Sequence, residues 1–273
     1  MPKFAILSDI HSNADALEVV LAKCAELGIT DFISLGDIVG YNAEPARCIE
    51  MVKQLNFVAM VRGNHDDYTA SGNTEMSGFN PNAKAAINWT RKQLSAAERA
   101  WLVSVPYIAT LPKFGVTVVH ATLDTPDTWG YVFDAHHAGD NFSYQRTALC
   151  FCGHSHVPVA FCKKPLSSRN ERMIDSIPEW NYSAVDPAAD TDFNRADELP
   201  VNYIRGGVHK YLFNIGSIGQ PRNGDPRASF AVLDTDKCVV TRYRLPYDIA
   251  SAQQKVLAAG LPERLARRLA AGN

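Results

Sequence analysis

The chain has 273 residues, of which 46% are hydrophobic and 21% are charged, and its formal net charge is -2. This composition can bury a sizeable core, which excludes a chain that is disordered throughout. The small net charge gives no general attraction to nucleic acids or anionic membranes, and no apolar run reaches the roughly 18 residues of a membrane-spanning helix. No signal-peptide pattern opens the sequence, and its six cysteines fit reduced thiols better than a disulfide framework. We therefore expect a globular, cytoplasmic protein with no membrane partner and no stable nucleic-acid partner.

Strand-like and helix-like patterns alternate over the first 120 residues. Short apolar runs bounded by Gly, Asn and Asp predict buried strands at Lys3–Ser8, Asp31–Leu35, Phe57–Val61 and Val116–Val119. Apolar residues at helical spacing predict helices between them, at Ala14–Cys24, Pro45–Gln54 and Ala83–Leu94. We expect a capping box formed by Ser12 and Asp15 at the start of the first helix. This alternation predicts a sheet covered by helices, with functional loops at the strand ends.

The second half of the chain is richer in strands and has few helical patterns. Strand-like runs separated by turn residues lie at Leu149–Cys152, Val157–Cys162, Tyr211–Ile215, Phe230–Asp234 and Cys238–Arg244. The two halves together predict a layered α/β (α+β) fold, in which two β-sheets pack as a sandwich flanked by helices. We expect residues 1–273 to form a single domain.

Two segments depart from this pattern. Residues 165–206 show no periodicity, and because a long structureless loop is uncommon in a compact domain, we interpret them as an irregular excursion or lid. Residues 248–271 predict a C-terminal helical segment with one apolar face, formed by Leu257, Leu261, Leu265 and Leu269. The arginines of this segment are interpreted as a solvated helix face.

Five polar clusters follow directly on predicted strands. They are Ser8-Asp9-Ile10-His11, Gly36-Asp37-Ile38-Val39-Gly40, Gly63-Asn64-His65-Asp66, Val119-His120-Ala121 and Gly153-His154-Ser155-His156. In an α/β sheet, loops that follow the strands meet at one edge, where their side chains can converge. The clusters hold five of the eight histidines of the chain, so the sequence predicts a site rich in imidazole at this edge.

The residue types in these clusters are those of a two-metal site. Asp9 and His11 are two residues apart on an extended loop, so both can bind one ion. Asp37 is the candidate carboxylate that bridges two ions about 3.5–4 Å apart. The other candidate ligands are Asn64, His120, His154 and His156. Mixed imidazole and carboxylate ligands favour Mn, Fe or Zn over Ca or Mg, and the sequence does not distinguish among the first three.

Each cluster alone has an ordinary structural explanation. Asp9 and Asp37 can be turn or capping residues, and Asn64 follows Gly63 in a dipeptide common in loops. His120 can be a buried core histidine with a satisfied hydrogen bond, and the Gly-His-Ser-His run can be a polar surface turn. Because all five clusters occur at successive strand ends, we favour a common site.

The ordered set Asp-x-His, Gly-Asp, Gly-Asn-His-Asp, a single His and Gly-His-x-His resembles the calcineurin-like metallophosphoesterase superfamily. The resemblance is closest to its bacterial and archaeal phosphodiesterase-like members, which share the Leu-Gly-Asp-Ile-Val-Gly-Tyr run of residues 35–41. They also share the Asn-x-Gly-Ser-x-Gly-Gln-Pro-Arg segment, present here as Asn214–Arg222. The resemblance implies the metallophosphoesterase-like fold, a pair of β-sheets between helices.

The resemblance also implies roles for individual residues. One metal would be held by Asp9, His11, Asp37 and His156, and the other by Asp37, Asn64, His120 and His154. A metal-bound hydroxide would attack phosphorus in line, and His65 would act as the general acid. Asp66 or Asp67 would orient the imidazole of His65, although Asp66 can equally be a helix cap. Asn64 and Arg222 are the candidate substrate contacts, and for Arg222 a salt bridge in a surface turn is the competing interpretation.

One departure from related enzymes is informative. Protein phosphatases and diadenosine tetraphosphatases resemble this chain in the core motifs, but their loop after Gly-Asp typically carries an arginine that binds phosphate. Gly40 and Tyr41 stand at these positions here, which weakens the prediction of protein phosphatase activity. His136 and His137 lie outside the motifs and are expected to be ordinary polar residues of a helix.

The sequence therefore predicts a dinuclear metal-dependent hydrolase that acts on a small phosphodiester or nucleotide. The alternatives are a phosphomonoesterase, that is, a nucleotide or protein phosphatase on the same site, and a catalytically silent binding scaffold. A nuclease is disfavoured because the chain lacks a basic, aromatic stripe. The native substrate, the preference for mono- or diesters, the metal and the oligomeric state are left open.

Overall fold

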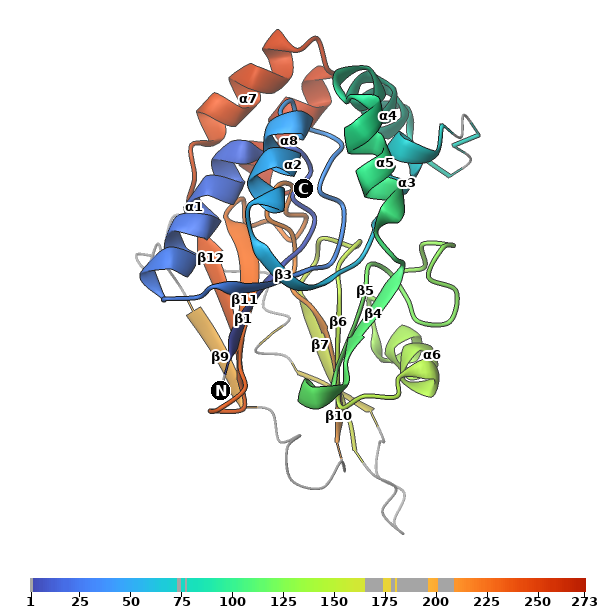
Figure 1. The fold of residues 1–273 in the computed structure, drawn as a ribbon, viewed down its shortest axis with the longest axis vertical. Helices are drawn as coiled ribbons and strands as arrows, with labels where there is room; N and C mark the ends of the chain where they lie inside the picture. The colour runs from blue at the N-terminus through green and yellow to red at the C-terminus, as the bar shows by residue number, and fades with distance from the viewer. Residues whose placement is uncertain are drawn as a thin grey trace.

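The computed structural model describes residues 2–72, 75–76, 78–164, 174–177, 180, 196–200 and 209–273. Its first half alternates strands and helices, and its second half is dominated by strands (Figure 1). The strands are β1 (Lys3–Leu7), β2 (Asp31–Ser34), β3 (Asn56–Met60), β4 (Ile108–Leu111), β5 (Val116–Val119), β6 (Leu149–Cys152), β7 (Val159–Lys163), β8 (Ile174–Ser176), β9 (Ala196–Pro200), β10 (Lys210–Asn214), β11 (Ala228–Asp234) and β12 (Val239–Leu245). The helices are α1 (Ala14–Glu26), α2 (Pro45–Lys53), α3 (Asn64–Ser71), α4 (Pro81–Gln93), α5 (Ala96–Ser104), the short 3-10 helix η1 (Pro112–Phe114), α6 (Ala135–Tyr144), α7 (Ile249–Ala258) and α8 (Glu263–Ala271).

The strands form two six-stranded sheets. One sheet has the order β3-β2-β1-β11-β12-β9, and the other has the order β4-β5-β6-β10-β7-β8. In the first sheet β1, β2 and β3 are parallel, whereas β11 pairs antiparallel with β1. In the second sheet β5, β6 and β10 are parallel. The ends of these parallel strands define the edge from which the polar loops emerge.

Alternation along the strands decides which core each side chain joins. Phe4 and Ile6 of β1 point into the core between the two sheets, together with Phe151 of β6 and Phe213 of β10. The alternate residues of β1, Ala5 and Leu7, pack on the opposite face, in the core shared with α1 and α2. A separate core lies between the second sheet and α6. Both faces of the central strands are buried, which explains their nearly continuous apolar runs.

The expected sandwich of two sheets flanked by helices is confirmed by this arrangement. The expected strands all occur within one or two residues of the expected bounds. Three further elements, α3, α5 and β4, are not predicted by the apolar patterns of the sequence. Strand β4 was missed because it alternates exposed and half-buried residues and has no buried one, and the capping box of α5 at Ser95 was not considered.

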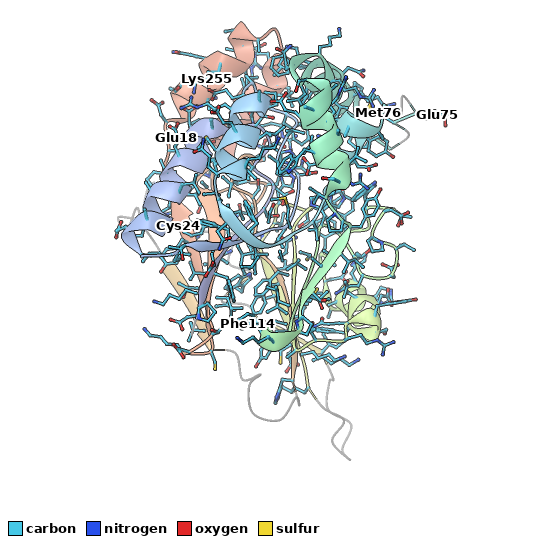
Figure 2. All side chains as sticks on the ribbon, in the orientation of Figure 1. Glu18, Cys24, Glu75, Met76, Phe114 and Lys255 are labelled. Carbon is cyan, nitrogen blue, oxygen red and sulfur yellow. The ribbon has the colours of Figure 1, made fainter. Side chains whose placement is uncertain are left out.

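The capping box expected from Ser12 and Asp15 is wrong. The residue that caps α1 is Asn13, whose side chain accepts a hydrogen bond from the amide of Ala16. Asp15 instead binds the ammonium group of Lys255 on α7, with the Nζ and Oδ2 atoms 2.8 Å apart. Figure 2 labels this lysine, which also binds Glu44 and so ties α7 to the segment that precedes α2.

The expected helical segment at 248–271 consists of two helices, α7 and α8, which are separated by Gly260 and Pro262. Leu261, Leu265 and Leu269 are buried as expected, whereas Leu257 is 50% exposed. The break in the helix changes the direction of the apolar face, so Leu257 does not share it.

Within the expected excursion at 165–206, the structure describes the edge strands β8 and β9. Residues 165–173, 178–179, 181–195 and 201–206 lie outside the described residues, so a lid in this segment stays a prediction. All six cysteines are free thiols, and five of them are buried. None of the helices in the described ranges is long and apolar enough to cross a membrane.

Candidate functional site

The five polar clusters meet at one edge of the sandwich. Asp9 and His11 follow β1, Asp37 follows β2, and Asn64 begins α3 just after β3. The loops of the second sheet face them from the other side and contribute three imidazoles, those of His120 after β5 and of His154 and His156 after β6. All seven side chains are buried, and they come from segments up to 147 positions apart in the sequence.

The backbone at this edge is held in an unfavourable conformation. Among the described residues, nine other than glycine have positive φ, and eight of these lie in the loops of the site or beside them: Asp9, His11, Ser12, Asp37, Tyr41, Trp129, His154 and His156. The left-handed region costs an L-residue about 1–3 kcal/mol, and such strain concentrates where function requires it. The surrounding hydrogen bonds therefore stabilise a backbone that these residues would not adopt alone.

Two groups of potential metal ligands overlap within the site. One consists of Asp9, His11, Asp37 and His156, and the other of Asp37, His120 and His154, and within each group one ligand atom per residue lies within 4.8 Å of the others. Asp37 belongs to both groups, as a bridging carboxylate requires. Asn64 lies at the second group, with its Oδ1 atom 3.1 Å from Nε2 of His120.

Backbone carbonyl groups fix the orientation of the four imidazoles. Nδ1 of His11, His120 and His156 lies 3.1, 2.8 and 2.6 Å from the carbonyl oxygens of Val39, Leu35 and Gln220, respectively. Nε2 of His154 lies 3.0 Å from the carbonyl oxygen of Trp129. A carbonyl oxygen only accepts hydrogen bonds, so each of these nitrogens carries the proton. Three histidines therefore direct the lone pair of Nε2 into the site, and His154 directs that of Nδ1.

The centre of the site is rich in acceptor atoms and fits metal cations. The Nε2 atoms of His11 and His156 lie 3.1 Å apart, although both are acceptors in the tautomers that the carbonyl groups impose. Oδ1 of Asp37 accepts from the amide of His65, whereas its buried Oδ2 has no hydrogen-bond partner. This Oδ2 lies 3.4 Å from Nε2 of both His11 and His120. Converging lone pairs with fixed tautomers are the arrangement that holds a metal ion.

Burial shapes the pKa values of the histidines. It lowers the pKa of His154 and of His156 to about 3, which keeps both rings neutral at pH 7. Burial also acts to lower the pKa of His120, but the negative charge of the nearby Asp37 outweighs this effect and raises the pKa to about 9. Because a metal ligand must be deprotonated, binding at His120 would release a proton.

The segment Asn214–Arg222 holds these loops in place through hydrogen bonds. The hydroxyl of Ser217 donates to the carbonyl oxygen of Asp9, and the amide of Gly219 donates to the same oxygen. The side chain of Asn214 donates to the carbonyl of Gly153 and to the hydroxyl of Ser155. The residues of this segment therefore hold the loops after β1 and β6 in register with each other.

A family model, described as the calcineurin-like phosphoesterase superfamily domain, matches residues 3–172. The match covers more than half of the chain and includes every loop of the site up to His156. The chain belongs to the calcineurin-like phosphoesterase superfamily.

Relatives support this membership along almost the whole length. An uncharacterized protein of Methanocaldococcus jannaschii is 34% identical over 270 residues, which are 98% of this chain and 97% of that protein. The crystal structure of a metallophosphoesterase from Sphaerobacter thermophilus is 36% identical, with a TM-score of 0.77, and covers 100% of this chain and 99% of that one. A hypothetical protein of Pyrococcus horikoshii is 19% identical with a TM-score of 0.74 over 100% and 99% of the two chains, which shows a shared fold.

Within this phosphoesterase fold, His65 is held by packing rather than by a carboxylate. Its ring lies 4.2 Å from that of Tyr41 and 5.4 Å from that of Phe79, between ring centroids. Its Nδ1 atom has no hydrogen-bond partner and lies against Gly40, where a Cβ atom would collide with the imidazole. Gly40 has a φ of +100°, so the close approach and the backbone conformation both favour glycine there.

The expectation that Asp66 or Asp67 orients His65 is wrong. Oδ1 of Asp66 accepts from the amide of Val39, and its Oδ2 accepts from the amide of Gly63 at the start of α3. Asp66 is therefore the helix cap, and it also anchors the loop after β2. Asp67 accepts from the hydroxyl of Tyr107 and pairs with Arg62, away from the imidazole.

The phosphoesterase site opens into a cavity of about 480 Å³. His65, Asp37 and Asn64 lie on its inner surface, and aromatic side chains form much of its wall, namely Tyr41, Tyr68, Phe79, Trp129 and Tyr131. Arg222 also lines it and donates to the hydroxyl of Tyr41 at 3.2 Å. Within the part of the chain that the structure describes, Arg222 forms no salt bridge, and its acceptors are Tyr41 and Gln220.

Arg268 of α8 lines the same cavity and was missed by sequence reasoning. The sequence analysis assigned the arginines of this helix to a solvated face. Helical spacing gave one usable signal, since Arg268 adjoins the buried Leu265 and Leu269 more closely than the exposed Arg267 does. Which of the three arginines reaches the site depends on how α8 packs on the rest of the molecule.

Proposed function

We propose that this member of the superfamily is a dinuclear metal-dependent hydrolase whose preferred substrate is a small phosphodiester. The observation that carries the proposal is the pair of overlapping ligand groups sharing Asp37, placed at the inner end of a cavity large enough for an organic ester. The mixture of imidazole and carboxylate ligands favours Mn, Fe or Zn. Metal ions bound there would act as Lewis acids toward the phosphoryl group and lower the pKa of a bound water.

The chain's own residues prepare the substrate for hydrolysis. Arg222, in the cavity wall, offers a guanidinium fork that can bind phosphoryl oxygens, and Asn64 offers an amide beside the second ligand group. Because Nδ1 of His65 lies against Gly40, Nε2 is the nitrogen that can reach an ester oxygen. Burial lowers the pKa of His65 well below its ordinary value, and an anionic ester next to the ring would raise it again. His65 would then donate a proton to the leaving oxygen.

The shape of the cavity supports a diester over a monoester. The aromatic wall beyond the ligand groups provides space and apolar contacts for a second ester substituent, which a monoester lacks. Gly40 and Tyr41 supply no guanidinium at the loop after β2, so the guanidinium groups of the cavity wall are those of Arg222 and Arg268, which come from other segments. A monoanionic diester needs less compensating charge than a dianionic monoester.

The test compares hydrolysis of bis-p-nitrophenyl phosphate with that of p-nitrophenyl phosphate by chelator-treated protein to which Mn²⁺ is added. We expect metal-dependent cleavage that favours the diester. His65→Ala should lower kcat by about 100-fold or more while the protein keeps its metal content. His136→Ala, a change at an exposed histidine of α6, is the matched control and should leave the rate unchanged.

Each alternative has its own outcome in this assay. Faster cleavage of p-nitrophenyl phosphate would replace the proposal with a phosphomonoesterase. Protein that binds two metal ions and cleaves neither ester would contradict the proposal and favour a binding scaffold.

A further inference from the structure

Two arginines from distant parts of the chain converge on one aromatic ring at the mouth of the cavity. Arg222 lies in the loop after β10, and its Cζ atom is 5.5 Å from the centroid of the Tyr41 ring. Arg268 lies on α8, and its Cζ atom is 6.0 Å from the same centroid. Both guanidinium groups line the cavity that contains His65 and Asp37.

Apolar packing places Arg268 there. Leu265 and Ala266 of α8 share a buried cluster with Ala83 and Ala86 of α4 and with Tyr41. Figure 1 shows α7 and α8 at the same end of the molecule as α4. Because the buried side of α8 is fixed against α4 and Tyr41, the neighbouring Arg268 is held at the border of the cavity rather than in open solvent. It is half-buried, whereas Arg264 and Arg267 are exposed.

Among the described residues, no Asp or Glu side chain pairs with either arginine. Arg222 donates to the neutral oxygens of Tyr41 and Gln220, and Arg268 donates through Nε to the carbonyl oxygen of Asn273. Asp127 also lines the cavity, but among the described residues it forms no ion pair with either arginine. By contrast, the exposed Arg267 pairs with Glu263 on the same helix. Half-buried guanidinium groups without an anion are costly, so an anionic ligand would stabilise them.

The charges around Arg268 also favour the binding of an anion. Burial lowers the pKa of Arg268, and repulsion from Arg222 and Arg264 adds to the effect. Arg264 and Arg268 line an adjoining hollow together with Asn80, Pro81 and Asn82 at the start of α4. The positive region therefore extends from the ligand groups past Tyr41 toward the N-terminus of that helix.

We propose that Arg222 and Arg268 form a subsite for a second phosphate group of the substrate. The inference rests on the proposed function, because the first phosphate would occupy the site of the Asp and His ligands. The substrate class is then an ester of diphosphate, or of a longer phosphate chain, rather than an ester with one phosphorus atom. Two guanidinium groups close to one ring offer several N–H donors to the oxygens of a terminal or internal phosphate.

Calorimetric titration of the full chain in Mn²⁺ with inorganic pyrophosphate and with inorganic phosphate tests the subsite. We expect wild-type protein to bind pyrophosphate at least about tenfold more tightly than phosphate, and Arg268→Gln to reduce this ratio about tenfold. Arg267→Gln is the matched control on the same helix and should keep the wild-type ratio. Pyrophosphate also binds free Mn²⁺, but this effect is equal for all variants and cancels in the comparison.

Arg268→Lys is a second variant in case Arg268→Gln does not fold. It keeps the positive charge and the packed aliphatic part of the side chain but removes the planar guanidinium group. It should retain a ratio between those of the wild type and of Arg268→Gln. A wild-type ratio in both variants, or an equal loss of affinity for the two anions, would overturn the subsite and leave Arg268 as a helix cap.

Hydrolysis of bis-p-nitrophenyl phosphate by the same preparations separates this inference from the proposed function. If Arg268→Gln lowers the preference for pyrophosphate over phosphate but the wild-type protein cleaves no ester, the proposed function alone is refuted. Normal cleavage with an unaltered ratio would refute the subsite alone.

Discussion

Side chains on the floor of the cavity, such as Asp37 and His156, are buried and fixed by hydrogen bonds to the backbone, whereas those on its rim, such as Tyr131 and Arg268, are partly exposed. The floor consists of strand-end loops whose left-handed residues are held by neighbouring loops. The rim consists of side chains that reach in from α8, from the loop before α6 and from the loop after β10. A rigid floor suits fixed chemistry, and an adjustable rim suits the selection of a substrate.

The largest effect is expected on the floor, at the carboxylate shared by both ligand groups. Asp37→Asn removes a charge that both groups use, so we expect the content of both metal ions to fall together. Loss of several kcal/mol of stabilisation corresponds to a decrease in kcat of about 1,000-fold or more. Elemental analysis and ester hydrolysis measure the two effects. Retention of one full metal equivalent would contradict the shared role of Asp37.

The next largest effect is expected on the free energy of unfolding, at Asp225, which anchors the loop that carries Arg222. Asp225 is 5% exposed and accepts hydrogen bonds from Arg227 and from the buried Arg244. Asp225→Asn would remove the buried negative charge that Arg227 and Arg244 both bind, and we expect the free energy of unfolding to fall by about 3 kcal/mol at pH 7. Denaturant unfolding of both proteins measures this difference.

The pH dependence of that difference follows from the pKa of Asp225. Burial acts to raise this pKa, but the hydrogen bonds and charge of Arg227, with the charge of Arg244, lower it below its ordinary value. The ionised carboxylate therefore stabilises the fold fully above about pH 4 and loses this contribution as the pH falls through its folded pKa. The gap between wild type and Asp225→Asn should narrow in that acidic range. A gap that is constant down to pH 2 would exclude the ion pair as its source.

A smaller effect is expected where floor and rim meet, at Gly40. Gly40→Ala places a methyl group against the His65 imidazole and requires alanine to adopt positive φ. Displacement of His65 should lower kcat about 10- to 100-fold, since misplacement by about 1 Å can have effects of this size. Metal content should stay at the wild-type value, because the imidazole of His65 is not among the ligand groups. Unchanged kcat in a folded variant would show that His65 tolerates displacement.

The smallest effect is expected from a single hydroxyl in the cavity wall, that of Tyr41. Tyr41→Phe keeps the ring that Arg222 and Arg268 flank but removes the acceptor of the hydrogen bond from Arg222. We expect KM for the diester to rise about fivefold, which corresponds to about 1 kcal/mol, with little change in kcat. A decrease in kcat with constant KM would instead place Tyr41 in the chemical step.

The difference between the floor and the rim of the cavity explains which residues of the site can be predicted from the sequence and which cannot. The floor follows from motifs next to apolar runs, since a residue that directly follows a buried strand has a nearly fixed position in a layered fold. Asp9, Asp37 and His120 could therefore be brought together without coordinates. The role of Asp66 could not be predicted in this way. An aspartate next to His65 can either cap the helix or bind the imidazole, and only the three-dimensional structure shows which amides its carboxylate reaches.

Rim residues carry no comparable signal. Arg264, Arg267 and Arg268 are equivalent in composition, and only the packing of Leu265 and Ala266 against α4 decides which of them enters the cavity. Strand β9 likewise owes its place to pairing with β12 rather than to an apolar pattern of its own. Such long-range pairings override weak local preferences, so periodicity alone does not detect them.

Strand β1 lies between β2, which follows it closely, and β11, which begins more than 200 residues later. The amide of Gly219, as remote in the sequence, also binds the carbonyl of Asp9. During synthesis on the ribosome, the second edge of β1 therefore stays uncovered until most of the chain, including β11, has been made. Nearly all of the polypeptide must emerge before the Asp9 loop is complete, so capture of metal in its final geometry is a late event in biogenesis.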